Sequence, residues 1–518
     1  MPTLPTVTPS SLRSASPGNA TRATFTMMGI VEGFYGPPWS WRDRLEVLQW
    51  SASRGLTDYM YAPKDDTKHR RAWREPYDAA EVAGFRSLVD QAGVRVGFAI
   101  SPGLSIDEAS PSDRGALAAK VDQIVDLGVT HVGLFLDDLP PDPSRTPAEQ
   151  GAAHAGLATW LRDHLEGRAE LSVCPTEYIG TQPSPYLTAF AQGLPADVAV
   201  GWTGASVVND QITGDEARAR ADALGGRPPL LWDNVPVNDA VMSDRLFMGP
   251  LRGRSVELRM ECCGYMANPM MQPRASMLPL ASIAAWCIGG DASSAWEAAA
   301  TELGWRAFAE ACDGAVPQQL VRVLIEEGDG PGWVGAADDL ESWLNAAATC
   351  AAPGLESEGA PWLEQVHAEA ALAQRALTLV RATRPRIEIS SDGSARAVVP
   401  DAARVLRHAF AVASEWPVVR RAFASVFGPR LGVRPALSQH SSGAWLWRAD
   451  AIEEDANATD DLVRLALDSA ARLDAGTPLV AFVDGIEMAR GPDVTFPAAS
   501  GCVVLARCGD LVTRVRVP

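Results

Sequence analysis

Short apolar runs recur along the first half of the chain and predict a repeating strand-and-helix fold. Eight runs follow one another at a mean spacing of about 35 residues, which leaves room for one helix after each strand. The runs cover residues 28–33, 58–63, 95–101, 131–138, 171–177, 198–203, 230–234 and 262–268. Eight strands that alternate with helices are typical of an α/β protein with a (β/α)8 barrel, the TIM barrel. We expect this barrel to occupy residues 27–291.

The stretches between the runs carry helix signals. Leu45, Leu48 and Ala52 recur at helical spacing before Gly55, and glycine is common just after the end of a helix. A similar pattern precedes Gly128. A helix over residues 276–288 is expected to close the barrel.

The chain changes character after residue 291. From residue 292 to about 377 the chain is rich in Ala, Glu and Leu with recurring tryptophans, which predicts a helical domain beside the barrel, at residues 292–428. Within it, 381–400 is partly strand-like and 402–427 has a helical pattern. Residues 429–518 combine a helical pattern at 459–473 with β-rich runs such as 479–483 and 503–506, and predict a small mixed α/β region. Residues 1–26 are rich in Ser, Thr and Pro, lack the apolar block of a secretory signal and are expected to be a disordered leader.

Charge and cysteine usage narrow the class of protein. The formal net charge is -19, and neither Lys nor Arg forms a dense run, which argues against nucleic acid and anionic membranes as partners. No apolar stretch is long enough to cross a bilayer. The eight cysteines lie mostly in apolar runs without a regular spacing, as expected for reduced thiols. We therefore expect a cytoplasmic protein.

Polar and aromatic residues follow most of the predicted strands. The run at 131–138 ends in Asp137 and Asp138, which taken alone have the composition of a solvated turn before Pro140. In a (β/α)8 barrel, however, the carboxyl ends of all the strands meet around one mouth, where the active site lies. The residues at or just beyond these ends include Glu32, Gly33, Lys64, Ser101, Asp137, Asp138, Glu177, Tyr178, Trp202, Thr203, Trp232, Asn234, Asp239 and Asn268.

The motifs around these positions occur in a specific order. They read GIVEGFYGPPW at 29–39, YAPKDD at 61–66, DD at 137–138, CPTEY at 174–178, WDN at 232–234, ND at 238–239 and NP at 268–269. Taken together, they resemble the family 84 glycoside hydrolases, which are the O-GlcNAcases and related bacterial β-N-acetylglucosaminidases. The resemblance covers residues 27–290 and is far more specific than any one motif.

The aspartate pair suits one particular glycosidase mechanism. Most glycosidases place two carboxyl groups on either side of the sugar, but two adjacent residues cannot easily do so. Adjacent aspartates better suit substrate-assisted catalysis, in which the 2-acetamido oxygen of the sugar attacks the anomeric carbon. The resemblance implies that Asp137 holds and polarises the acetamido group and that Asp138 is the general acid and later the base. Like charges at close range are expected to leave one carboxyl group ionised and the other protonated.

The resemblance also implies roles for the other residues at the mouth. Tyr178 would hydrogen-bond the acetamido oxygen, Trp232 would line the pocket for the acetyl methyl group, and Asn234 would steady the acetamido group and Asp137. The outer hydroxyls of the sugar would be bound by the Gly33 backbone carbonyl, Lys64, Asp239 and Asn268. The implied activity is retaining exo-cleavage of terminal β-linked GlcNAc from a glycan or glycoprotein, through an oxazoline and without a metal or organic cofactor. Self-association through the helical domain is a further expectation.

Two other functions remain open at this point. Lys64 at a strand end is compatible with a Schiff-base aldolase, although such a lysine usually needs an apolar pocket and the neighbours of Lys64 are polar. A GlcNAc-binding barrel without turnover is the second alternative, and it has no need of a general acid. Ala240 follows Asp239, where animal members of the family carry an aromatic residue, which implies a reduced wall of the aglycone groove. Protein O-GlcNAc, cell-wall fragments and free oligosaccharides are all open as substrates.

Overall fold

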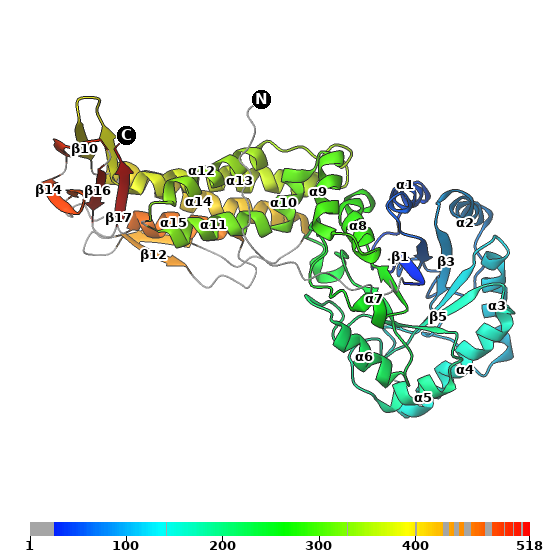
Figure 1. The fold of residues 1–518 in the computed structure, drawn as a ribbon. Coiled ribbons are helices and arrows are strands. Elements are labelled where there is room, and N and C mark those ends of the chain that lie inside the picture. Colours follow the sequence, from blue (N-terminus) through cyan, green and yellow to red (C-terminus); the bar gives the residue numbers. More distant parts are fainter. Residues whose placement is uncertain are drawn as a thin grey trace.

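The computed structural model describes three successive parts of the chain (Figure 1). The described residues are 25–140, 142–328, 330–398, 401–427, 435–439, 445–449, 457–471, 479–491, 493–500, 502–508 and 511–517. A barrel lies at one end of an elongated molecule, a helical bundle extends from it, and small sheets lie at the far end of the bundle. Nearly all of the expected leader, residues 1–24, lies outside the described residues.

The first part is a closed barrel of eight parallel strands in sequence order, which confirms the predicted TIM barrel. Its strands are β1 (Met27–Glu32), β2 (Asp58–Tyr61), β3 (Arg95–Ile100), β4 (His131–Phe135), β5 (Glu170–Cys174), β6 (Ala199–Trp202), β7 (Leu230–Asp233) and β8 (Gly264–Ala267). The surrounding helices are α1 (Trp41–Ala52), α2 (Ala79–Gln91), α3 (Pro111–Val125), α4 (Pro147–Leu165), α5 (Pro185–Gly193), α6 (Gly214–Ala223), α7 (Leu258–Glu261) and α8 (Pro273–Cys287).

Several of these helices begin with a capping box, which satisfies free backbone N–H groups at both the N-cap and N3 positions. The boxes pair Asp78 with Glu81, Thr146 with Glu149 and Thr213 with Glu216. These polar signals fix where α2, α4 and α6 begin, and hence how long the loops before them are.

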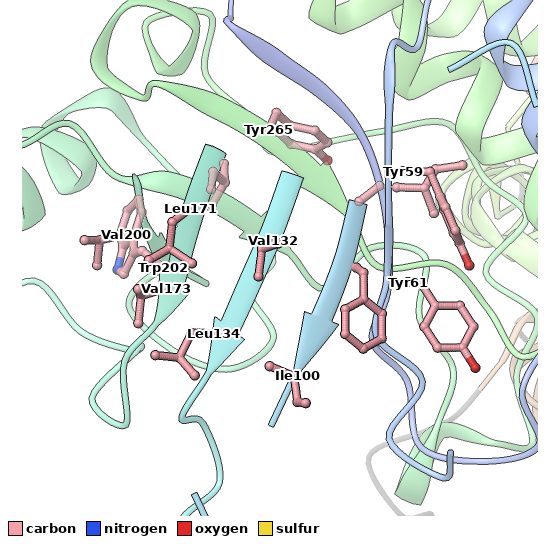
Figure 2. Packing of buried hydrophobic residues seen from close by; sticks show 14 of the residues in the cluster. Tyr59, Tyr61, Ile100, Val132, Leu134, Leu171, Val173, Val200, Trp202 and Tyr265 are labelled. Atoms are coloured by element: carbon pink, nitrogen blue, oxygen red, sulfur yellow. The ribbon is translucent and has the colours of Figure 1, made fainter. Parts of the chain in front are cut away.

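Alternation along the strands divides the apolar residues between two clusters. Val132 and Leu134 of β4 point outward and pack with residues such as Val200 under the helices (Figure 2). Phe135 points into the barrel, where it contacts Trp232 with ring centroids 5.0 Å apart. Successive side chains of a strand face opposite sides, so one short run can serve both clusters. The inner cluster ends just below the barrel mouth.

The helical bundle and the small sheets make up the rest of the described chain. The bundle contains α9 (Ala292–Leu303), α10 (Arg306–Asp313), α11 (Ala315–Glu327), α12 (Trp333–Ala348), α13 (Ala360–Thr383), α14 (Ala402–Phe427) and α15 (Ala458–Ala471). The sheets are formed by β9 (Arg386–Ile389), β10 (Ser394–Val398), β11 (Pro435–Gln439), β12 (Trp445–Ala449), β13 (Leu479–Val483), β14 (Ile486–Gly491), β15 (Asp493–Pro497), β16 (Val503–Cys508) and β17 (Leu511–Arg516).

These parts are interleaved along the sequence more than a boundary at residue 428 suggests. Helix α15 lies beyond that position, yet Leu462 and Leu467 share a buried cluster with Leu372 and Ala376 of α13. Strand β10 lies before it, yet pairs with β15 in one antiparallel sheet. The physical reason is that each of these elements has an apolar face whose partner is distant in sequence. None of the helices in the described ranges has the length and hydropathy needed to cross a membrane.

One of the barrel segments that fix the bundle is the connection from β7 to α7. The indole of Trp362 donates to the Asp244 carbonyl at 2.9 Å, and the indole of Trp296 donates to the Met248 carbonyl at 2.6 Å. Arg252 makes a paired hydrogen bond to Asp313 at 2.6 and 2.8 Å. A buried cluster joins residues of the loop and of α8 to α9, α10 and α13. The loop that carries Asp239 is therefore braced by the bundle.

Candidate active site

A buried ion pair lies at the barrel mouth where β2 and β4 end. The Nζ atom of Lys64 contacts Oδ2 of Asp137, and the side chains of both residues are almost fully buried. Burial opposes a charged lysine, but the charge of Asp137 and the hydrogen bond to it more than offset this effect and raise the pKa of Lys64. The other oxygen of Asp137, Oδ1, is buried and has no hydrogen-bond partner among the described residues. It is an acceptor without a donor.

Asp138 lies beside this pair and faces the solvent side of the mouth. Its backbone has a φ of +53°, in the left-handed region that aspartate tolerates better than most residues. This conformation turns the chain so that the carboxylate of Asp137 is buried against Lys64 and that of Asp138 is exposed. The Tyr178 hydroxyl donates to Oδ1 of Asp138 at 2.8 Å, and the Tyr35 hydroxyl donates to Oδ2 at 2.7 Å.

A chain of side-chain amides crosses the mouth from β7 to β1. The Asn234 carbonyl oxygen accepts from Trp232 Nε1 at 3.1 Å and from Asn268 Nδ2 at 2.9 Å. The Asn268 carbonyl oxygen in turn accepts from the Gly33 amide at 3.1 Å. Gly33 leaves room for the indole of Trp232, because a Cβ atom at position 33 would lie 2.3 Å from that ring. The Asp239 carboxylate accepts a hydrogen bond from the Tyr35 amide at 2.7 Å.

The structure thus brings together all nine residues singled out from the sequence. They are Gly33, Lys64, Asp137, Asp138, Tyr178, Trp232, Asn234, Asp239 and Asn268. The contacts above link them in three groups, and Lys64 brings the groups together, because its Nζ atom lies 5.7 Å from the Trp232 ring centroid and 6.0 Å from that of Tyr35. Other strand-end residues are engaged elsewhere. Glu32 is buried between Arg44 and Tyr59, and the Glu177 side chain accepts from Ser184. In the described part of the chain, no group of three or more His, Cys, Asp or Glu side chains is arranged to hold a metal ion.

Comparison with known proteins connects this geometry to a family. A family model described as beta-N-acetylglucosaminidase matches residues 28–314, more than half of the chain. The chain belongs to this family. The resemblance to family 84 glycoside hydrolases noted from the motifs is thereby confirmed.

Curated relatives include protein O-GlcNAcases from Rattus norvegicus and Mus musculus. The rat protein is 34% identical over 286 residues, which are 53% of this chain and 31% of the relative. The mouse protein is 34% identical over 282 residues, which are 52% of this chain and 31% of the relative. The match therefore spans about a third of the length of these relatives.

Two solved structures share the wider architecture. A point mutant of the O-GlcNAc hydrolase of Thermobaculum terrenum has a TM-score of 0.67 at 26% identity, over 86% of this chain and 95% of the other. The protein CpGH84B has a TM-score of 0.65 at 22% identity, over 78% and 74% of the two chains, which indicates likeness of fold. The likeness to the first structure extends well beyond the barrel.

The electrostatics of this β-N-acetylglucosaminidase family site differ from expectation at Asp138. Burial would raise the pKa of Asp138, but the Tyr35 hydroxyl, the charge of Lys64 and the Tyr178 hydroxyl, with help from Arg70, lower it below its ordinary value. Repulsion between the two aspartates alone predicts that one of them is protonated. Lys64 weakens that repulsion by neutralising Asp137, and both donors favour the ionised form of Asp138.

Two residues of the site had no role assigned from the sequence. Tyr35 lies between Asp138 and Arg70, whose Nη1 atom donates to the Tyr35 hydroxyl oxygen at 2.8 Å. Arg70 also reaches the Asp138 carbonyl oxygen at 3.4 Å. Tyr35 belongs to the motif at 29–39 and Arg70 follows the motif at 61–66, but only the fold shows that they meet at the acid. A tyrosine inside the motif GFYG is easily interpreted as part of the core.

Removing the Tyr35 hydroxyl is expected to raise the pKa of Asp138. Tyr35→Phe takes away a donor that stabilises the carboxylate. If Asp138 must be protonated to act as an acid, the decline of kcat/KM on the alkaline side should move to higher pH in this variant. The measurement is the pH profile of kcat/KM, which reports ionisations of the free enzyme. Tyr77→Phe, which removes a hydroxyl bonded to Asp66 away from the pair, is the control. An unchanged pH profile would show that the Tyr35 hydroxyl does not affect the ionisation of the catalytic acid.

Proposed function

We propose that the protein is a retaining exo-β-N-acetylglucosaminidase of the O-GlcNAcase type that removes terminal β-linked GlcNAc by substrate-assisted catalysis. The observation that carries the proposal is the different surroundings of Asp137 and Asp138. Asp137 is held as a buried carboxylate by Lys64, with one oxygen left without a donor. Asp138 is reached from solvent and bound by two hydroxyls that a substrate can displace. The family model and the curated relatives support the hydrolase class.

The first step forms an oxazoline from the substrate itself. Oδ1 of Asp137 accepts the acetamido N–H, which raises the electron density on the acetamido oxygen. That oxygen attacks the anomeric carbon while the glycosidic bond breaks, and Asp138 gives its proton to the departing oxygen. The acetamido proton passes to Oδ1 of Asp137 as the oxazoline forms, while Lys64 stays paired with Oδ2, and it returns to the nitrogen when water opens the ring. Trp232 lies above Phe135 and supplies an apolar surface for the acetyl methyl group.

The second step opens the oxazoline with water. Asp138, now ionised, removes a proton from water that attacks the anomeric carbon from the side that the leaving group occupied. Two displacements at one carbon leave the β configuration retained. Both steps use the same carboxyl group in opposite directions, so an acid exposed to solvent at the mouth suits the task better than a buried one.

Substrate binding favours the protonated form of Asp138, which the resting site disfavours. In the proposed complex, the Tyr178 hydroxyl turns from Asp138 to the acetamido oxygen. Asp138 then loses one of the donors that lower its pKa, and the sugar excludes water from it. Both changes raise the pKa of Asp138 toward the range in which it can act as an acid. Asp239, Asn268, Lys64 and the Gly33 carbonyl bind the outer hydroxyls.

Exposed aliphatic side chains favour a protein-borne GlcNAc as the substrate. Ile179 follows Tyr178, Val207 accepts the Asn234 amide through its carbonyl, and Val241 follows Ala240. Their side chains are 44%, 44% and 65% exposed. Aliphatic groups can bury peptide side chains but offer no hydrogen bonds to a second sugar. Of these residues, Val241 lies next to Ala240, where the resemblance implies an aromatic residue in animal members of the family.

A chromogenic aryl β-N-acetylglucosaminide tests the function directly. The protein should release the aryl alcohol, and NMR should detect the β-anomer of GlcNAc before mutarotation. On the substrate preference, a GlcNAc-serine peptide should have a higher kcat/KM than chitobiose. Absence of turnover would leave the GlcNAc-binding barrel as the better function. The aldolase alternative is disfavoured because the ion pair with Asp137 raises the pKa of Lys64, whereas a Schiff-base lysine needs it lowered.

A further inference from the structure

A fully buried arginine lies behind the loop that carries Tyr178. Arg220 belongs to α6, and its relative exposure is 0%. Within the described ranges, no carboxylate forms an ion pair with its guanidinium group. Burial lowers the pKa of Arg220 to about 10, which still leaves the group charged at neutral pH. A buried cation without a carboxylate is costly unless other groups solvate it.

Backbone carbonyls of the Tyr178 loop solvate this cation. The Nη2 atom of Arg220 donates to the Glu177 carbonyl at 2.6 Å. Its Nη1 atom lies 3.3 Å from the Ile179 carbonyl and 3.4 Å from the Gly180 carbonyl. The three carbonyls come from residues on either side of Tyr178. Arg220 therefore binds the loop on both sides of Tyr178, the residue whose hydroxyl contacts Asp138.

The end of β6 completes the fixation of this loop. The Thr203 amide donates to the Tyr178 carbonyl at 3.1 Å, and the Gly180 amide donates to the Gly204 carbonyl at 2.9 Å. Gly180 has a φ of +83°, which lets the chain turn sharply around the guanidinium. The backbone around Tyr178 is therefore held by hydrogen bonds from two sides.

We propose that Arg220 is a positioning residue of the active site, which sets the place of the Tyr178 hydroxyl by gathering the carbonyls of its loop. It contacts neither substrate nor the reacting atoms and acts through Tyr178. The effect on turnover rests on the proposed function, in which Tyr178 binds the acetamido oxygen. The effect on Asp138 does not, because the hydrogen bond between Tyr178 and Asp138 exists without a substrate. A displacement of about 1 Å in such a group can cost up to about 10²-fold in rate.

A double-mutant cycle separates positioning from general destabilisation. Arg220→Lys keeps the charge but cannot gather three carbonyls in one plane. We expect it to lower kcat/KM for an aryl N-acetylglucosaminide by about 10-fold in the native background. In a Tyr178→Phe background, where no hydroxyl is left to misplace, the same change should cost less than about twofold. An equal cost in both backgrounds would overturn the proposal.

Arg227 provides a matched control. Its guanidinium donates to the carbonyls of Leu194, Pro195, Ala196 and Val198 at 2.6–3.0 Å. These carbonyls precede β6, at the end of the barrel opposite the mouth. Both Arg227→Lys and Arg220→Lys should lower the melting temperature, but Arg227→Lys should leave kcat/KM unchanged. A loss of activity in both variants would point to stability alone and overturn the proposal.

A second readout is independent of turnover. The Asp138 carboxyl group can be titrated by ¹³C NMR of protein labelled at its aspartates, with the resonance assigned by its loss in Asp138→Asn. Arg220→Lys should raise the pKa of Asp138 in the native background and leave it unchanged in Tyr178→Phe. An unchanged pKa in the native background would overturn the proposal even if the enzyme is active. A raised pKa in a protein without glycosidase activity would support the role of Arg220 while the proposed function fails. Arg220→Gln serves the same test if the lysine variant does not fold.

Discussion

A β-glucoside without the 2-acetamido group is expected to react at least about 10⁴-fold more slowly than the matched N-acetylglucosaminide, because it lacks the nucleophile. Asp137 is a poor replacement for that nucleophile, because its ion pair with Lys64 reduces the negative charge available for attack. The measurement is kcat/KM for the two substrates with one aryl leaving group. Comparable rates would exclude substrate assistance.

Fluorine atoms on the acetyl group sharpen this test. Each fluorine weakens the attacking oxygen, so the rate should fall progressively from acetyl to trifluoroacetyl. In Asp137→Ala the dependence on fluorine should change, because that residue is proposed to polarise the acetamide. A bicyclic inhibitor that mimics the oxazoline should bind tightly, as transition-state-like ligands do. A covalent sugar trapped on a carboxylate, or inversion at the anomeric carbon, would contradict the mechanism.

Asp138→Asn is expected to lose at least about 10²-fold in kcat/KM on substrates with poor leaving groups. Activated aryl glycosides, whose leaving groups depart without a proton, should show a much smaller loss of rate in the glycosylation step. The asparagine is close in shape. Its amide oxygen can accept from one of the two tyrosine hydroxyls and its NH2 group can donate to the other, so the variant tests the proton and not the fold. The plot of rate against leaving-group pKa should therefore become steeper.

Asp142→Asn is the matched control for the acid. Asp142 lies in the same loop, where its Oδ1 accepts from the amide and hydroxyl of Ser144 at 2.8 and 2.6 Å. It makes no contact with the tyrosines of the site that the structure records, and both classes of substrate should react at the native rate. If Asp138→Asn lost equally on both classes, the acid would have to be another residue.

The sequence was sufficient for the barrel because strand periodicity is a local signal. Each predicted run overlaps one of the eight strands, and the helix predicted at 402–427 coincides with α14. Residues next to strand ends were also within reach, since the barrel topology brings all strand ends to one mouth. Asp137 and Asn268 lie in the same site although they are far apart in the chain.

Contacts between distant segments were beyond such reasoning. Tyr35 and Asp138 are 103 positions apart, and the sequence contains no periodic signal that joins them. Arg220 lies in a helix rich in charged residues, where an arginine is expected to be solvated. Helix α15 has an ordinary amphipathic pattern. This pattern predicts that its apolar face packs against another element, but it does not identify that element as α13. The depressed pKa of Asp138 followed from such contacts and was missed for the same reason.

The cluster that joins the barrel to the bundle makes their folding interdependent. Met248 of the β7–α7 loop and Leu278 of α8 share buried apolar contacts with Trp296 and Phe308 of the bundle. A shortened chain that stops after α8 would leave this surface in water, and the loop that carries Asp239 would lose the indole donors that hold it. The smallest autonomous catalytic fragment is therefore expected to extend through α13. In heat or denaturant, the barrel and the near end of the bundle should melt as one cooperative unit.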